Sequence, residues 1–148
     1  MAQKKSEDTI NIGWILRTLL ITLGVLIIGA AVFFAFRIRT NARLALREAK
    51  NIYISLSTTE IEYYAQEKSI YDPTKIDGLS DGVKERVRSI MDPEGTYSLA
   101  SFDTTKHRIR VMHYRKGNYY ITYSGDGDVN NWEVNYLMPI LWLSGTDQ

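Results

Sequence analysis

The sequence predicts an α+β fold in which one long N-terminal helix, half transmembrane and half amphipathic, packs on a four-stranded antiparallel meander. No charged residue occurs between Thr18 and Phe36. Beyond that run, apolar and small residues recur in steps of three and four as far as Tyr63, and from Tyr97 onward the period changes to two. Steps of three and four define one helix face, whereas strict alternation indicates a half-buried strand.

The predicted organisation has four parts. Residues 1–12 form a polar leader, residues 13–36 a transmembrane helix, residues 37–67 its amphipathic extension, and residues 68–148 a small α+β head. About 20 apolar residues, at about 1.5 Å rise each, cross a hydrocarbon core of about 30 Å.

A cleaved secretory signal is the alternative interpretation of the apolar run. Lys4 and Lys5 precede it, and Gly29-Ala30-Ala31 offers small residues to a peptidase. However, the run is longer than a usual signal and continues past that point to Phe36. The sequence therefore favours a retained, single-pass membrane anchor.

One face of the long helix carries mostly small or aliphatic residues along its length. They are Gly24, Ile28, Ala31, Ala35, Ile38, Ala42, Ala45, Ala49, Ile52 and Leu56. Small residues let helix backbones approach closely, so we interpret this face as a packing seam for another helix. The alternative is that residues 52–56 cover the sheet of their own head. Residues 51–64 also alternate as in a strand, but the unbroken face favours a helix.

The head begins with a connection, residues 68–82, that is rich in Pro, Asp, Gly and Ser. A second helix is expected over residues 81–91, capped by Ser80 or Asp81. Its apolar face comprises Val83, Val87, Ile90 and Met91. Four strands follow, predicted at residues 97–102, 107–114, 119–123 and 132–136. An antiparallel meander buries one face, and the long helix is the expected cover.

Composition limits the functions available. The chain has 148 residues, a formal net charge of +1 and no cysteine. Apart from the anchor, this length suits one small domain. The balanced charge gives no reason to expect a polyanion as partner, and without cysteine there is no disulfide, thiol nucleophile or thiolate metal site.

Residues suited to catalysis are sparse. His107 and His113 are predicted on one strand, on the side of Ile109 and Val111, but roughly 20 Å apart at about 3.3 Å per residue. No phosphate loop or nucleophile elbow occurs. We therefore expect a non-enzymatic protein without a small-molecule substrate.

A basic hairpin is one candidate binding feature. It contains Lys106, Arg108, Arg110, Arg115 and Lys116. Arg108 and Arg110 are expected on the strand face of Met112 and Tyr114, which is compatible with an anionic partner. A solvated face is favoured, so nucleic acid is not an expected partner.

A calcium site with a weak sequence signal is another candidate. Asp126, Asp128 and Asn130 place oxygen side chains at alternate positions, as at the start of a calcium loop. Asn131 stands where an EF-hand has glycine, and Leu137 where it has glutamate. Asp, Asn and Gly also dominate hairpin turns, so we favour a turn without a cofactor, with calcium as the alternative.

The polar leader, the apolar helix with its amphipathic extension and the small meander together resemble the type IV pilin and pseudopilin family over nearly the whole chain. In that family a prepilin peptidase cuts after a glycine and leaves an aromatic N-terminus. The resemblance implies Gly13 and Trp14 as that pair. The family's glutamate at the fifth mature position, thought to pair with a neighbouring subunit's N-terminus, is Thr18 here.

The resemblance implies a structural subunit or minor component of a pilus or secretion apparatus, which assembles through its membrane helix with itself or related helical subunits. The alternative is a membrane-anchored binding or scaffold domain with a cone-like head, similar to the nuclear-transport-factor superfamily. A helix continuous through residues 37–41 favours the first, and a break there favours the second.

The side of the membrane is predicted differently by two arguments. A pilin's head is extracytoplasmic, but five cations follow the apolar run and three precede it. Those that follow are Arg37, Arg39, Arg43, Arg47 and Lys50. By the positive-inside rule, this excess favours a cytoplasmic head. The apolar residues 137–143 are either a final strand or a docking tail for a partner.

Overall fold

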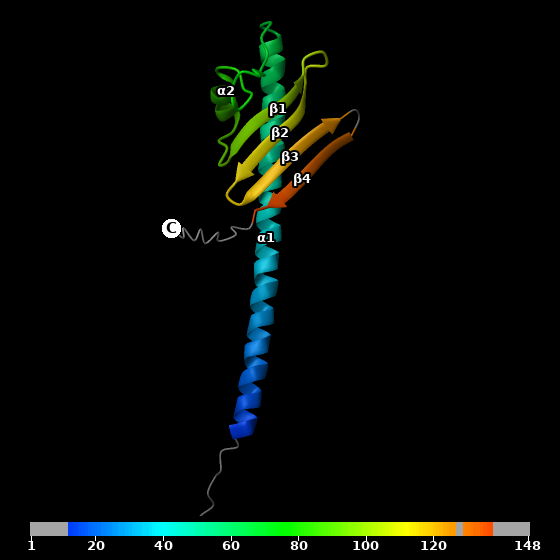
Figure 1. Cartoon of the computed structure of the whole chain (residues 1–148). Coiled ribbons are helices and arrows are strands. Elements are labelled where there is room, and N and C mark those ends of the chain that lie inside the picture. Colours follow the sequence, from blue (N-terminus) through cyan, green and yellow to red (C-terminus); the bar gives the residue numbers. More distant parts are fainter. Residues whose placement is uncertain (1–11, 127–128, 138–148) are drawn as a thin grey trace, which may run out of the picture. The chain divides into compact units, whose positions relative to one another are not determined.

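A single helix of 53 residues, α1 (Ile12–Tyr64), precedes a four-stranded antiparallel sheet in the chain (Figure 1). The computed structural model describes residues 12–126 and 129–137. The strands lie in sequence order, each paired with the next. They are β1 (Thr96–Asp103), β2 (Arg108–Lys116), β3 (Tyr119–Asp126) and β4 (Val129–Tyr136). The predicted α+β class and the helical state of residues 51–64 are confirmed.

Helix α1 spans two compact units that divide between Thr40 and Asn41. In the first unit its large apolar side chains are exposed. Among residues 12–126 and 129–137, α1 is the one helix long and apolar enough to cross a membrane. Its helical assignment continues without a break through residues 37–41. From Asn41 onward, the predicted amphipathic extension belongs to the same unit as the sheet.

The end of α1 is set by a left-handed residue. Glu67 has φ of 58°, and the N–H of Lys68 donates back to the carbonyl of Tyr63 at 2.9 Å. A residue in the left-handed region with such a backward bond is a common way to end a helix. The helix therefore ends at Tyr64, three residues before the predicted boundary.

The core of the head lies between α1 and the inner face of the sheet. Its buried apolar residues come from α1, the connection, α2 (Val83–Ile90) and the first three strands. They are Ala45, Ala49, Ile52, Leu56, Ile70, Leu79, Val83, Val87, Leu99, Phe102, Ile109, Met112, Tyr114, Ile121 and Tyr123. Figure 1 shows the four strands side by side along this part of α1. The helix covers the apolar sheet face, as expected for a two-layer domain.

Helix α2 is shorter than predicted, and its cap differs. Gly82, with φ of 82°, occupies the N-cap position, and no side chain caps the helix. Asp81 instead forms an ion pair with Lys75 at 2.5 Å. The prediction of Ser80 or Asp81 as a capping side chain is therefore wrong, although Val83 and Val87 are buried as expected.

The β1–β2 ladder contains an irregularity that changes which residues face the core. Register shifts occur on both sides of Ser101, so Ile109 and Met112 are both buried although they are three residues apart. An extra residue in a ladder moves the following side chains to the other face. The predicted common face of Arg110 with Met112 and Tyr114 is therefore wrong, because Arg110 is exposed whereas the other two are buried.

Strand boundaries also differ from the prediction. His107 precedes β2 in a left-handed conformation, with φ of 48°. The β2–β3 connection is only Gly117–Asn118, where Gly117 supplies the positive φ that tight hairpins require. Strand β4 starts at Val129, which pairs with Asp126. The strands are thus longer and the turns tighter than alternation alone indicated.

The two sides of α1 should respond differently to truncation. Leu56 is fully buried, whereas Ile54 is 60% exposed. Leu56→Ala should lower the free energy of unfolding of the head by about 2–5 kcal/mol, since it leaves a cavity. Ile54→Ala should change it by less than about 1 kcal/mol. Denaturant unfolding of the full chain in detergent, followed by near-UV circular dichroism, measures both, and equal losses would contradict the assigned packing.

Candidate functional site

One half of the predicted packing seam is occupied by the head itself. Ala45, Ala49, Ile52 and Leu56 are at most 1% exposed and belong to the core. The seam prediction is therefore wrong for these four residues, and the alternative of an internal face holds. The physical reason is that a four-stranded sheet has an apolar face, and this helix face is the one that covers it.

The seam residues of the apolar segment are mostly exposed within the described chain. Ile28, Ala31 and Ala35 are exposed, and a Cβ placed on Gly24 would meet no atom within 4 Å. Ile38 and Ala42 are half-buried. Helix packing by this stretch stays a prediction.

A different face of α1, exposed in the head, carries three aliphatic side chains among polar ones. Leu44, Ile54 and Ile61 are 53%, 60% and 71% exposed. At about 100° per residue, they lie roughly opposite the buried residues around the helix axis. Arg47, Asn51 and Thr58, also exposed, lie between them. We call the face formed by these six residues the outer stripe.

The outer stripe was missed by sequence reasoning although a signal for it existed. Its positions recur in alternating steps of three and four, which is also helix periodicity. The alanine-rich face has the same period and was selected because small residues are enriched at helix contacts in membranes. Periodicity identifies two candidate faces, and burial distinguishes them.

The basic hairpin is partly neutralised by its own chain. Lys116 lies 2.7 Å from an Oε of Glu48 and 2.6 Å from an Oε of Glu94. The N–H of Glu94 donates to the other oxygen of Glu48 at 2.7 Å. Burial raises the pKa of Glu48, but hydrogen bonds, first among them the one from Lys116, outweigh it and hold that pKa below its usual value. These three residues tie α1, β2 and the segment before β1 together.

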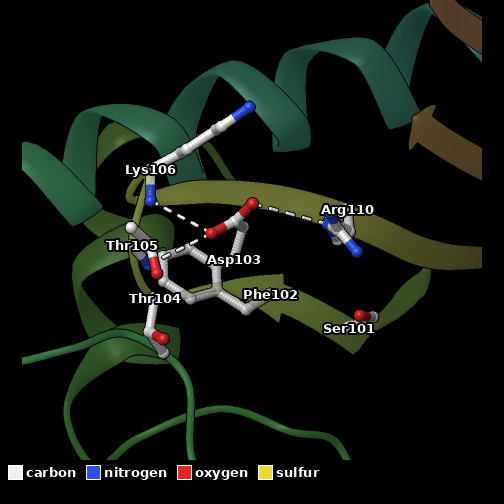
Figure 2. Close-up of a pocket in the computed structure, with 7 residues that line it drawn as sticks. All are labelled: Ser101, Phe102, Asp103, Thr104, Thr105, Lys106 and Arg110. Carbon is white, nitrogen blue, oxygen red and sulfur yellow. Dashed lines mark hydrogen bonds and ion pairs between the residues drawn. The ribbon is translucent and has the colours of Figure 1, made fainter. Parts of the chain in front are cut away.

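Arg110, another cation of the hairpin, forms an ion pair with Asp103 at the β1–β2 turn. A cavity of about 450 Å³ lies at this turn (Figure 2). Asp103 accepts hydrogen bonds from the N–H groups of Lys106 and Thr105 at 3.0 and 3.1 Å. The Lys106 bond contributes most to keeping the pKa of Asp103 below its usual value. Arg110 Nε lies 3.5 Å from the other carboxylate oxygen. The carboxylate thus organises a turn, which agrees with a solvated face.

The two histidines have separate structural roles. His107 Nδ1 lies 3.1 Å from the buried carboxylate of Glu60, which also accepts the N–H of Ile70 at 3.1 Å. Its ring contacts that of Tyr64 at 4.2 Å between centroids. His113 instead stacks on Tyr120, at 5.4 Å. The structure does not bring the histidines together.

The predicted calcium loop lies only partly within the described chain. Asp128 falls outside it, and the side chain of Asp126 is not described. Asn130 lies in β4, where its Oδ1 accepts a hydrogen bond from the hydroxyl of Tyr123 at 2.7 Å. No group of three or more metal-binding side chains occurs in the described ranges 12–126 and 129–137. Calcium stays an untested alternative to a turn.

The implied processing pair lies at the start of α1. Gly13 and Trp14 are both exposed, and Thr18 Oγ1 donates to the carbonyl of Trp14 at 3.0 Å. Cleavage between them stays a prediction. Residues 138–143 of the apolar C-terminal segment lie outside the described residues, whereas Leu137 is 47% exposed and donates its N–H to the carbonyl of Asn118 at 2.7 Å.

Comparisons with known proteins find no match to a family model, to a curated protein or to a solved structure.

Removal of Lys116 should change the pH dependence of stability. Lys116→Met leaves the Glu48 carboxylate, only 14% exposed, without its cation, and should cost about 1–3 kcal/mol near neutral pH. Because the pKa of Glu48 is lowered in the folded state, its stabilisation is present above the unfolded-state pKa and is lost as the pH falls through the folded-state pKa. The variant should therefore lose less stability on acidification than the parent protein.

Denaturant unfolding at several pH values measures this effect. Lys68→Met, at an exposed position after α1, is the matched control and should keep the parent's acid dependence. Parallel curves for parent and Lys116→Met would show that Glu48 and Lys116 are not energetically coupled.

Proposed function

We propose that this chain is a pilin-like subunit: a single-pass membrane protein that acts by lateral assembly of its long helix with copies of itself or with related helical subunits. Its role is structural, as a filament subunit or minor component of a pilus or secretion apparatus. Its head is extracytoplasmic in this proposal.

The outer stripe is the observation that carries the proposal. In a helix that only covers its own sheet, the opposite face is expected to be polar. Here Leu44, Ile54 and Ile61 are exposed on that face, in line with the polar Arg47, Asn51 and Thr58. Aliphatic side chains at this helical spacing match contact positions of a helix that packs against a second helix.

The continuity of α1 supports a shared helical element instead of an independent head on a tether. Helical assignment passes through Arg37 and Asn41 without interruption. The uncovered small residues of the first unit, among them Gly24 and Ala31, suit close helix approach in lipid. The ordering of a preformed helix costs little conformational entropy on association.

A non-enzymatic role is part of the proposal. Three carboxylates of the head bind groups of the same chain. Glu48 binds Lys116, Asp103 organises a turn, and Glu60 binds His107. Each of these carboxylates stabilises a junction between segments of the head. That use suits a protein whose task is to hold a shape during assembly.

A membrane-anchored binding domain with a cytoplasmic head is the second candidate. The observation in its favour is the excess of arginine directly after the apolar segment, with Arg37, Arg39, Arg43 and Arg47 all exposed. Such an excess is typical of the cytoplasmic side of a membrane helix. The two candidates therefore differ in topology.

Disruption of the outer stripe should abolish association. Thr58→Cys places one thiol within the stripe of a chain that has no natural cysteine. A short bismaleimide should then link it to a second copy or to a related subunit in membranes. Addition of Ile54→Arg and Ile61→Arg should reduce the linked product at least about tenfold, since a buried unpaired cation costs more than about 1.4 kcal/mol.

The matched control replaces the same two residues by leucine, which keeps both positions apolar and should preserve the crosslink. Circular dichroism of each variant checks that the head stays folded. Undiminished crosslinking by the double arginine variant would refute assembly through the outer stripe.

Labelling of the head in intact cells separates the two candidates. Thr104→Cys lies in the exposed β1–β2 turn. For a pilin-like subunit, a membrane-impermeant maleimide should label it without lysis. Labelling that requires lysis would place the head in the cytoplasm and favour the anchored binding domain.

A further inference from the structure

The connection between α1 and α2 presents one apolar side chain, Ile76, entirely to solvent. Its relative exposure is 108%, the largest among the exposed large hydrophobic residues of the described chain. It stands between Lys75 and Asp77, whose charged groups turn to other partners, Asp81 and Lys84 respectively. Ile76 therefore forms an isolated apolar knob.

The loop that carries the knob is rigidly held. Asp72 accepts hydrogen bonds through Oδ1 from both the N–H and the hydroxyl of Thr74, at 3.0 and 2.6 Å. Backbone bonds close the loop across its base, with Asp72 N–H donating to Gly78 at 3.1 Å and Gly78 N–H donating to Lys75 at 3.0 Å. A loop fixed in this way loses little entropy when its tip is bound.

The loop is also fixed to the sheet. The N–H of Leu99 in β1 donates to the carbonyl of Asp77 at 2.8 Å, and Tyr71 forms an isolated bridge with Leu79. Gly78 has φ of 67° and lies so close to the Leu99 carbonyl that a Cβ could not be accommodated. The knob is thus held in a defined position at the β1 edge.

A groove of about 350 Å³ lies directly beside the knob. Ile76, Asp77 and Lys84 form part of its lining. The strands supply the rest: Thr96, Tyr97, Ser98, His113, Tyr114, Arg115 and Tyr120. The stacked rings of His113 and Tyr120 offer an apolar surface to a side chain that enters. The groove is large enough for an isoleucine side chain.

Charge complements shape in this arrangement. Asp81 and Asp77 are paired with Lys75 and Lys84, so Asp72 is the carboxylate of the loop that forms no ion pair with another described residue. The groove contains Arg115, which is exposed and likewise takes part in no ion pair among the described residues. A carboxylate on the loop beside a guanidinium in the groove attracts the same pair of groups on another molecule.

We propose that two copies of this chain pair through their heads, with the Ile76 knob of each copy inserted in the groove of the other. Knob and groove are adjacent on one face, so a two-fold axis between the copies satisfies both contacts at once. Arg115 of each copy then faces Asp72 of its partner. This contact is separate from the outer stripe and does not depend on assembly through α1.

Crosslinking of the full chain in detergent tests the contact. A Thr74→Cys variant, labelled beside the knob, is mixed with a differently tagged Ser98→Cys variant, labelled in the groove. Both also carry Ile54→Arg and Ile61→Arg, so that association through α1 is removed. A short bismaleimide should join the two tags, and light scattering should give a dimer.

Ile76→Asp in both partners should reduce the joined product at least about tenfold, because truncation or charge at a central apolar anchor commonly costs 2 kcal/mol or more. Ile90→Asp is the matched control, since Ile90 is also an exposed isoleucine of the head, at 44%, and should leave the product unchanged. Arg115→Glu should weaken pairing.

Absence of the joined product in the Ile76 parent, or its persistence in Ile76→Asp, would overturn the proposal. Particles larger than dimers would replace the two-fold pair by an open chain of knob-to-groove contacts. None of these outcomes affects the outer stripe, whose test uses Thr58→Cys without the loop variants.

Discussion

Burial of one face of α1 against the inner face of the sheet is the interaction on which the rest of the head depends. Ala45, Ala49, Ile52 and Leu56 are buried in the same core as Met112 and the other inward-facing residues of the sheet. A lone four-stranded meander leaves its apolar face open to water, and an isolated amphipathic helix lacks a core. Each element therefore supplies the surface that the other lacks.

Polar contacts then fix how the segments around this core are joined. Glu48, Glu94 and Lys116 join α1, the segment before β1 and the end of β2, while Glu60 joins α1 to His107 before β2 and to Ile70 in the connection. Buried or half-buried carboxylates of this kind are stable only when donors surround them. The charges that sequence reasoning treated as a possible binding face are used mainly to hold the head together.

Because the core buries one face of α1, partners can bind only to other surfaces of the head. The outer stripe presents Leu44, Ile54 and Ile61 on the helix side that the sheet does not reach. The Ile76 knob projects from a loop that is closed by its own hydrogen bonds. One surface suits packing along a helix, and the other suits insertion of a single side chain. Both kinds of contact fit a protein that acts by assembly.

Sequence periodicity alone determined the long helix, the four strands and their order, because a change of period from 3.6 to two is a local property of the chain. It did not determine which helix face serves the core, since the alanine-rich face and the face of Ile54 have the same period and only the sheet's position distinguishes them. Periodicity also did not predict that His107 lies outside β2. Nor did it predict that both Ile109 and Met112 are buried, because the register shift at Ser101 arises from pairing between strands. The Ile76 knob was likewise invisible in sequence, since its exposure depends on bonds from Asp72, Gly78 and Leu99, which only the folded chain brings together.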